Sequence, residues 1–152
     1  VVDLGAAPGS WSQFISRKFK NTKIVSIDLK EMDSIENIIQ IKGDFTDEEQ
    51  QKKITTYFKD KIDIVISDMA VNTTGNKNLD SLVTGELCLE AFNFATKTLK
   101  KKGNFISKLF MGSSFNEIVA FAKKKFKDVY IFKPPSSRKD SKESFIICKN
   151  LR

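Results

Sequence analysis

The sequence of 152 residues contains no histidine. A histidine-dependent catalytic triad, a histidine metal site and a histidine general base are therefore all excluded. Proton transfer must fall to lysine, aspartate, glutamate or tyrosine, and no residue pattern predicts a bound metal. Cysteine is scarce too, because only Cys88 and Cys148 are present, far apart and without a Cys-x-x-Cys pair. This usage favours buried thiols in a reducing compartment.

Long apolar runs are also missing. No stretch approaches the roughly 20 apolar residues that a membrane-spanning helix needs, and no secretory signal is recognisable. We therefore expect a protein that contacts no membrane, is not secreted, and lies in the cytoplasm, the nucleus or an organelle such as the mitochondrion. The chain opens inside an apolar run, so we expect further residues upstream of Val1.

The residues that are present are typical of a folded domain. With 40% hydrophobic and 30% charged residues, a chain of this length predicts one domain over residues 1–152. Lysine and arginine number 26 against 19 aspartates and glutamates, and the net charge of +7 favours contact with a polyanion. On its own, this charge also fits a merely solvated surface.

Apolar segments and helical patterns alternate along the chain. Strands are predicted at residues 1–4, 23–27, 38–41, 62–67, 104–107, 128–132 and 145–148. Helices are predicted from Ser10, which caps the first, over 46–57 with Thr46 and Glu49 in capping-box register, over 80–99 before a Lys-Lys-Lys-Gly stop, and over 115–126. The order predicts an α/β fold with seven strands, mostly parallel, and helices on both faces. The last two strands form a hairpin, which makes one strand antiparallel.

Five of the predicted strands end at residues that could bind a ligand or take part in catalysis, namely Gly5, Asp28, Asp44, Asp68 and Lys108. In an open α/β sheet, ligands bind outside the carboxyl ends of the strands. These residues are therefore expected to meet at one edge of the sheet.

The turn at residues 5–9, Gly-Ala-Ala-Pro-Gly, differs from a dinucleotide-binding turn in an informative way. Ala7 stands where the second glycine of that motif lets the backbone approach a pyrophosphate, and Pro8 removes an N–H donor. The turn therefore favours a nucleoside cofactor without phosphate, such as S-adenosylmethionine. The same proline, with the absence of a Tyr-x-x-x-Lys pair, disfavours a nicotinamide-dependent oxidoreductase.

Acidic side chains that follow the second and third strands suit the nucleoside. Asp28 is placed to accept hydrogen bonds from ribose hydroxyls, Asp44 to meet the adenine amino group, and Phe45 to form an apolar wall. Each aspartate could alternatively serve only to begin a turn. Trp11 also has two interpretations, as a core aromatic or as a wall at the methionine end of the site.

Asp68 and Lys108 follow two apolar strands that should be neighbours in the sheet, so their side chains are expected side by side. Glu143, at the start of the last strand, is a third candidate. Methyl transfer to a weak nucleophile such as a ribose hydroxyl needs a base, and a buried lysine oriented by carboxylates can serve. The alternative is that these are ordinary surface charges at strand ends.

Five motifs, in order and over essentially the whole chain, carry a family resemblance: DLGAAPGSWSQ, GDFTD, SDMAVNTTG, FISKLFMG and KPPSSRKDSKESF. Together they resemble the FtsJ/RrmJ family of RNA 2′-O-ribose methyltransferases. The resemblance implies a Rossmann-like class I methyltransferase fold that uses S-adenosylmethionine. It also implies a Lys-Asp-Lys-Glu tetrad, of which Asp68, Lys108 and Glu143 match the last three members, with Lys108 as the base.

The expected cofactor site combines the turn, the acidic residues and their neighbours. Its residues are Gly5, Ala6, Pro8, Gly9, Ser10, Trp11, Asp28, Leu29, Asp44, Phe45 and Asp68.

Three features depart from the family pattern. The first lysine of the tetrad belongs on a helix upstream of the first strand, before this chain begins. Val71 stands where proline is usual, and Ser10 where a second glycine is common in bacterial members.

The resemblance gives the basic surface a purpose, which is to hold RNA beside the reacting residues. Candidates near Glu143 are Lys133, Arg138, Lys139 and Lys142. The expected substrate is a uridine of large-subunit ribosomal RNA, free or in a ribosomal subunit, methylated by a monomer. Transfer RNA, an mRNA cap, or a non-catalytic RNA-binding role are the alternatives.

Overall fold

The computed structural model describes the chain except for residues 8, 60, 70–75, 111–113 and 135–142. The elements follow in the order β1 (Val2–Leu4), α1 (Ser10–Lys18), β2 (Ile24–Asp28), β3 (Ile38–Lys42), α2 (Glu48–Thr56), β4 (Ile62–Ser67), α3 (Lys77–Thr98), β5 (Leu99–Phe110), α4 (Phe115–Lys125), β6 (Phe126–Phe132) and β7 (Glu143–Leu151). Among these described elements, no helix is long and apolar enough to cross a membrane.

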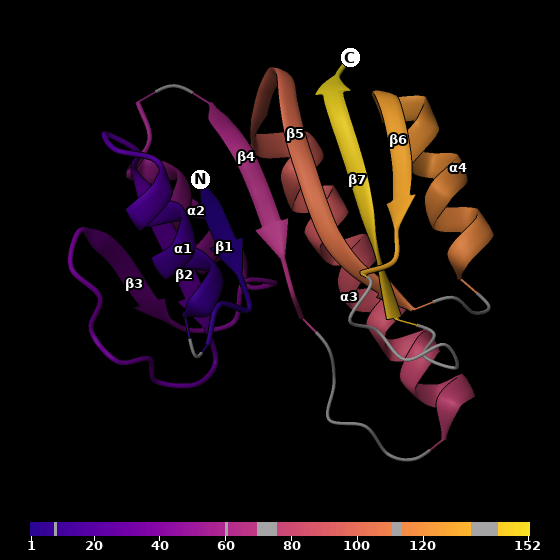
Figure 1. Cartoon of the computed structure of the whole chain (residues 1–152), viewed down its shortest axis with the longest axis horizontal. Helices are drawn as coiled ribbons and strands as arrows, with labels where there is room; N and C mark the ends of the chain where they lie inside the picture. The colour runs from indigo at the N-terminus through magenta and orange to yellow at the C-terminus, as the bar shows by residue number, and fades with distance from the viewer. Residues whose placement is uncertain (8, 60, 70–75, 111–113, 135–142) are drawn as a thin grey trace.

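The seven strands form one sheet in the order β3-β2-β1-β4-β5-β7-β6 (Figure 1). Strands β1 to β5 are parallel, and β7 lies antiparallel between β5 and β6. This confirms the predicted sheet, including the antiparallel strand. The strand order reverses at β1, between β2 and β4, and such a switch point opens a crevice at the carboxyl ends of the strands.

Alternating side chains of the strands enter two separate hydrophobic cores. The larger core joins Val2, Leu4 and their neighbours to α2, α3 and α4. The smaller core includes Val1, Ile24 and Ile66, against which Trp11 and Ile15 of α1 pack. Helices therefore lie on both faces of the sheet, as predicted, with α1 on one face and the other three on the opposite face.

Both cysteines lie in the larger core, Cys88 on α3 and Cys148 on β7. They are free thiols and are buried, which confirms the expectation for these residues. Burial raises the pKa of Cys88 to about 11 and that of Cys148 to about 12.

The predicted helix starts were wrong in three places. Ser10 is the first residue of α1 rather than its cap, because Gly9 takes that position in a left-handed conformation and no side chain caps the helix. Asp47, not Thr46, caps α2 by accepting a hydrogen bond from the backbone N–H of Glu49. Helix α3 begins at Lys77, three residues before the predicted start at residue 80.

The fifth strand is also longer than predicted. It begins at Leu99, directly after α3, and therefore includes the Lys-Lys-Lys-Gly segment that was expected to stop a helix. At its other end it continues to Phe110, because residues Phe105 to Phe110 pair with β7. Lys108 consequently lies within β5 rather than at its end.

Candidate active site

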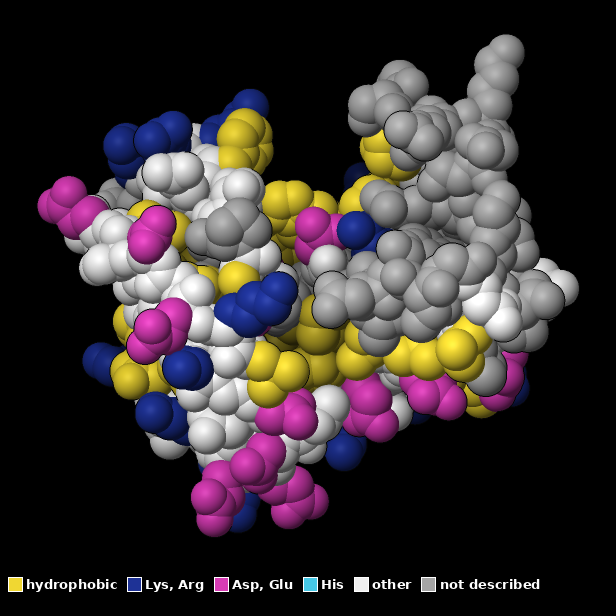
Figure 2. Space-filling model, turned by 90° about the horizontal axis from the view of Figure 1, so that it is seen from below, with side chains coloured by type: hydrophobic (Ala, Val, Ile, Leu, Met, Phe, Trp, Pro, Cys, Tyr) yellow, Lys and Arg dark blue, Asp and Glu magenta, His cyan; other side chains and the backbone are white. Residues whose placement is uncertain are grey.

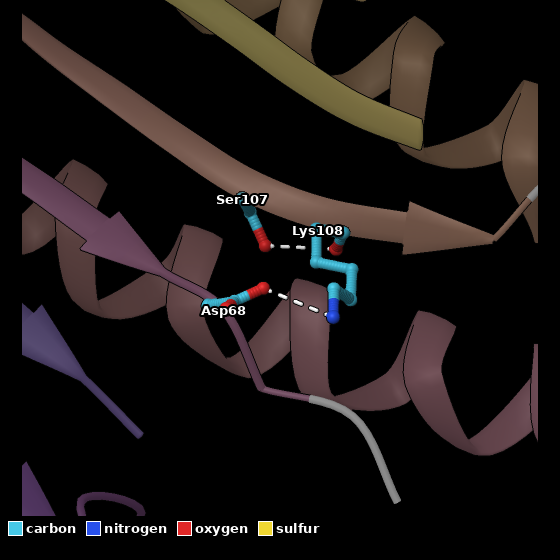
Figure 3. A network of polar contacts seen from close by, with 3 residues as sticks. All are labelled: Asp68, Ser107 and Lys108. Atoms are coloured by element: carbon cyan, nitrogen blue, oxygen red, sulfur yellow. Dashed lines mark hydrogen bonds and ion pairs between the residues drawn. The ribbon is translucent and has the colours of Figure 1, made fainter. Parts of the chain in front are cut away.

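An acid and an amine meet where β4 and β5 run side by side (Figure 3). Asp68 follows Ser67, the last residue of β4, and Ser67 is in register with Ser107 of β5. The Nζ atom of Lys108 lies 3.0 Å from Oδ1 of Asp68. The parallel pairing therefore brings the two side chains together, and their predicted proximity is confirmed.

The two members of this ion pair differ in exposure. The Lys108 side chain is 14% exposed, whereas that of Asp68 is 36% exposed. The adjacent Ser107 hydroxyl donates to the backbone carbonyl of Lys108 at 3.0 Å. The amine is thus mostly enclosed and meets a buried oxygen of Asp68, although the Asp68 side chain as a whole is partly exposed.

Glu143 begins β7 and pairs with Phe110, whereas Lys108 pairs with Phe145. Its backbone therefore lies two residues along β7 from the partner of Lys108. The side chain of Glu143 is outside the described part of the chain, so its predicted role stays a prediction.

A cavity of about 600 Å³ opens at the carboxyl ends of β1, β2 and β4. It is lined by Gly5, Ala7, Ile27, Asp28, Leu29, Lys30, Gly43, Asp44, Phe45, Thr46, Asp68, Met69 and Leu87. Figure 2 views this end of the molecule, where the surface is hollowed and hydrophobic side chains lie between charged ones. Asp68 both lines the cavity and pairs with Lys108, so it joins the cavity to the ion pair.

The turn after β1 depends on glycine at both ends. Gly5 has φ +68°, and a Cβ there would clash with Cγ of Met69. Gly9 has φ +113°, and a Cβ there would lie 2.8 Å from Cδ1 of Ile35. Other residues rarely adopt such angles. The turn therefore presents backbone, rather than side chains, to the cavity.

Asp28 is fixed by two backbone hydrogen bonds. Its Oδ2 accepts from the N–H of Ala7 at 3.0 Å, and its Oδ1 accepts from the N–H of Lys30 at 2.8 Å. An ionised carboxylate has about four acceptor sites, so further acceptor capacity remains for hydroxyl groups. Asp28 thus anchors the turn and also lines the cavity.

Asp44 stabilises a turn, which agrees with the alternative interpretation that this residue begins a turn. Its Oδ1 accepts from the backbone N–H of Thr46 at 2.9 Å and from the Thr46 hydroxyl at 2.7 Å. It also lines the cavity, as does Phe45, whose side chain is otherwise buried. Leu29 lines the cavity too, but its side chain is among the most exposed hydrophobic ones of the described chain.

The other residues expected at the cofactor do not line the cavity. Ala6, Gly9, Ser10 and Trp11 are absent from its wall, and Pro8 lies outside the described residues. Trp11 instead packs on Phe145, with ring centroids 5.6 Å apart, in the smaller core. This contact favours the interpretation of Trp11 as a packing residue.

Sequence reasoning missed several lining residues. Ala7, Lys30, Gly43 and Met69 each stand next to or near a predicted site residue, and that adjacency was the available signal. Leu87 comes from α3, far along the chain, and nothing in the sequence marked it.

Asp3 was also missed, although it lies directly beneath the turn. It is buried in β1 and accepts a hydrogen bond from the Ser12 hydroxyl at 2.6 Å. Burial, and then the negative charges of Asp68 and Asp28, raise the pKa of Asp3 to about 6, against the opposing effect of the Ser12 hydrogen bond. This acid is therefore sensitive to charge in the site.

Of the basic residues expected to hold RNA, Lys133 is exposed and directly follows β6. Arg138, Lys139 and Lys142 lie outside the described residues, as does Val71.

A mostly parallel sheet with a glycine-ended turn after β1, an acid at the end of β2, and an acid after β4 paired with an amine of β5 defines a Rossmann-like methyltransferase. Known proteins agree. The FtsJ-like methyltransferase family matches residues 1–151. The ribosomal RNA large subunit methyltransferase E of Pelagibacter ubique is 66% identical over 152 residues, which is all of this chain and 75% of that protein.

Two solved structures are similar in fold. A ribosomal RNA methyltransferase from Plasmodium falciparum is 34% identical, with a TM-score of 0.87 over 99% of this chain and 85% of that chain. Human methyltransferase-like protein 13, solved in complex with SAH, is 13% identical, with a TM-score of 0.68 over 98% of this chain and 70% of that chain. The chain belongs to the FtsJ-like methyltransferase family, which confirms the resemblance seen in its motifs, and it is an enzyme of that class.

Proposed function

We propose that this enzyme transfers a methyl group from S-adenosylmethionine to the 2′-hydroxyl of a ribose, on a uridine of large-subunit ribosomal RNA. The observation that carries this proposal is the double position of Asp68, which lines a nucleoside-sized cavity and pairs with Lys108 at 3.0 Å. A donor in the cavity and an acceptor at the amine would therefore meet at this carboxylate.

The cavity residues fit S-adenosylmethionine. A phosphate-free nucleoside suits a turn that offers close backbone but lacks the second glycine of a pyrophosphate site. Asp28 has acceptor capacity for ribose hydroxyls, and the half-exposed carboxylate of Asp68 suits a positive charge. The human relative in fold was solved with SAH, the demethylated product, which supports the same cofactor class.

When bound, S-adenosylmethionine supplies a methyl group on a positively charged sulfur. The protein must then position the ribose hydroxyl and remove its proton. Lys108, once it has given its own proton to solvent, would accept this proton, and Asp68 would orient the amine. Glu143, whose backbone starts the neighbouring strand, is proposed as the second orienting carboxylate.

RNA is the proposed substrate because of the relatives' names and the charge of the chain. The Pelagibacter relative is named for large-subunit ribosomal RNA, and the net charge of +7 favours a polyanion. We propose that Lys133, Arg138, Lys139 and Lys142 contact phosphates beside the reacting residues. We further propose that the enzyme acts as a monomer, and that it lies in the cytoplasm, for which its bacterial relative is the support.

The decisive experiment is transfer of labelled methyl groups to purified large ribosomal subunits, with transfer RNA as the competing substrate. We expect label in the large-subunit RNA at a dinucleotide linkage that resists alkali, because a methylated 2′-oxygen cannot attack the neighbouring phosphate. Label in transfer RNA alone would contradict the ribosomal assignment. Label at an alkali-sensitive linkage would contradict ribose methylation.

A further inference from the structure

Three buried polar residues connect the elements around the cofactor cavity. Asp3 of β1, Ser12 of α1 and Ser26 of β2 are each at most 1% exposed. The Ser12 hydroxyl donates to Oδ2 of Asp3 at 2.6 Å, and the Ser26 hydroxyl lies 2.6 Å from that of Ser12. Because Ser12 has one proton to give, Ser26 donates to Ser12 when Asp3 accepts.

This Asp3–Ser12–Ser26 cluster lies immediately behind the glycine-ended turn. Asp3 precedes Gly5 by two residues and is in register with Ser26 on one side and Ile66 on the other. Ser12 lies in the first turn of α1, a helix with no side-chain cap. The cluster therefore ties the start of α1 to β1, which leads into the glycine-ended turn, and to β2, which ends at Asp28.

The other carboxylate oxygen of Asp3 accepts no comparable hydrogen bond. Oδ1 is buried and has no hydrogen-bond partner among the described residues. A buried carboxylate oxygen without a donor is unfavourable as an anion, and protonation lessens that cost by neutralising the charge. Without a positive charge nearby, the neutral acid is therefore favoured more strongly here than it would be in water.

The charges that face Asp3 are those of the cofactor cavity. Asp68 after β4 and Asp28 at the end of β2 both raise its pKa, whereas α1 contributes the Ser12 hydroxyl, which lowers it. Lys108 of β5 lies beyond Asp68 and pairs with it. Of these groups, Asp28 and Asp68 line the cavity, so a cation placed there would offset the repulsion that Asp3 experiences.

We propose that Asp3 is a positioning residue whose ionisation is linked to the charge of the cofactor. In acidic solution, where Asp3 is protonated in the free enzyme, binding of the cationic donor S-adenosylmethionine converts the neutral acid to a carboxylate and releases its proton to solvent. S-adenosylhomocysteine, which has lost the charge on sulfur, releases less. The inference rests on the proposed function, because it requires this cofactor in this cavity.

The direction of the pH dependence follows. Above about pH 6 Asp3 is already ionised, so the donor binds without proton release. Below about pH 6 binding must expel the proton, so the affinity for S-adenosylmethionine falls as the pH decreases. Each unit by which the cation lowers the pKa of Asp3 corresponds to about a tenfold loss of affinity at low pH. The enzyme therefore prefers donor over product more strongly at pH 7.5 than at pH 5.5.

Isothermal titration calorimetry at pH 6, in two buffers of different ionisation enthalpy, measures the protons released on binding. We expect the wild-type protein to release a larger fraction of a proton with S-adenosylmethionine than with S-adenosylhomocysteine. Asp3→Asn keeps an acceptor for Ser12 but cannot ionise, so its proton release should vanish and its affinity should become flat between pH 5.5 and 7.5. Asp47→Asn, at the cap of α2, is the matched control and should behave as wild type.

Ser12→Ala provides a second test that survives if Asp3→Asn does not fold. Because the Ser12 hydrogen bond lowers the pKa of Asp3, its loss should shift the midpoint of the affinity profile to higher pH. A merely structural defect would lower the affinity equally at every pH. Equal proton release with donor and product, or unchanged release in Asp3→Asn, would overturn the inference alone. Failure of the wild type to bind the donor at all would instead overturn the proposed function.

Discussion

The two ends of the candidate site are built in different ways. At the cofactor end, the carboxylate of Asp28 on β2 accepts a hydrogen bond from the backbone N–H of Ala7, so a side chain holds the backbone of the turn after β1. At the reacting end, Asp68 and Lys108 come from neighbouring strands and meet as an ion pair. Asp28 and Lys108 thus have separate supports, so a substitution of either residue should leave the other end largely intact, whereas Asp68 belongs to both ends.

Lys108→Ala should produce the largest effect, because it removes the proposed base. Loss of a general base lowers turnover by about 10²- to 10⁴-fold. Single-turnover methyl transfer to ribosomal subunits measures this loss, and calorimetry should show nearly unchanged cofactor affinity. Lys53→Ala, on the exposed face of α2, is the matched control and should keep wild-type turnover. Substantial residual turnover in Lys108→Ala would count against a base at this position.

Gly5→Ala should damage the cofactor end through its backbone. The new Cβ would clash with Met69, and the φ of +68° disfavours any side chain, so the free energy of unfolding should fall by about 1–3 kcal/mol. Chemical denaturation measures this change. Adding Met69→Ala should recover the part due to the clash but not the part due to backbone strain. Wild-type stability of the single variant would contradict the geometry of the turn.

Asp28→Ala should weaken cofactor binding while sparing chemistry. It removes the acceptor for the N–H groups of Ala7 and Lys30 as well as the proposed ribose contacts, so affinity should fall by about tenfold to a hundredfold. Calorimetry measures the affinity, and turnover at saturating cofactor should stay near the wild-type value. Asp28→Asn, which keeps one acceptor oxygen, should have a cofactor affinity between those of the wild type and Asp28→Ala. Unchanged affinity would remove Asp28 from the ribose role.

Asp47→Ala should have the smallest effect and none on either end of the site. It removes the cap of α2, which contributes about 1 kcal/mol to the free energy of unfolding. Chemical denaturation should show this loss with methyl transfer unchanged. Thr46→Ala, which leaves the cap in place, should cost less. The opposite ranking would favour the capping box that the sequence first indicated.

Much of this arrangement could be predicted because it depends on local patterns. The glycine-ended turn, Asp28 and Asp68 each stand directly at the end of an apolar strand in the sequence. The proximity of Asp68 and Lys108 followed from the rule that sequential parallel strands are neighbours.

The wrong or missing predictions concern two situations. In one, neighbouring residues competed for the same capping role; in the other, contacts with distant segments of the chain set the end of a strand or the position of a side chain. The spacing of Thr46 and Glu49 fits a capping box, but Asp44 engages the Thr46 hydroxyl and Asp47 takes the cap instead. The far end of β5 is set by pairing with β7, which follows much later in the chain. Leu87 reaches the cavity only because α3 packs across the sheet. Asp3 had no local signal, since its partners come from α1 and β2.

The two cysteines give the molecule a built-in reporter of core opening. Alkylating reagents attack the thiolate, and raised pKa values together with exposures of 2% for Cys88 and 0% for Cys148 leave almost none available at neutral pH. Modification therefore requires a separation of the larger core, which contains both thiols. The labelling rate of the unaltered chain then records how often that separation occurs, and a saturating cofactor should slow it if the cavity closes onto the same sheet.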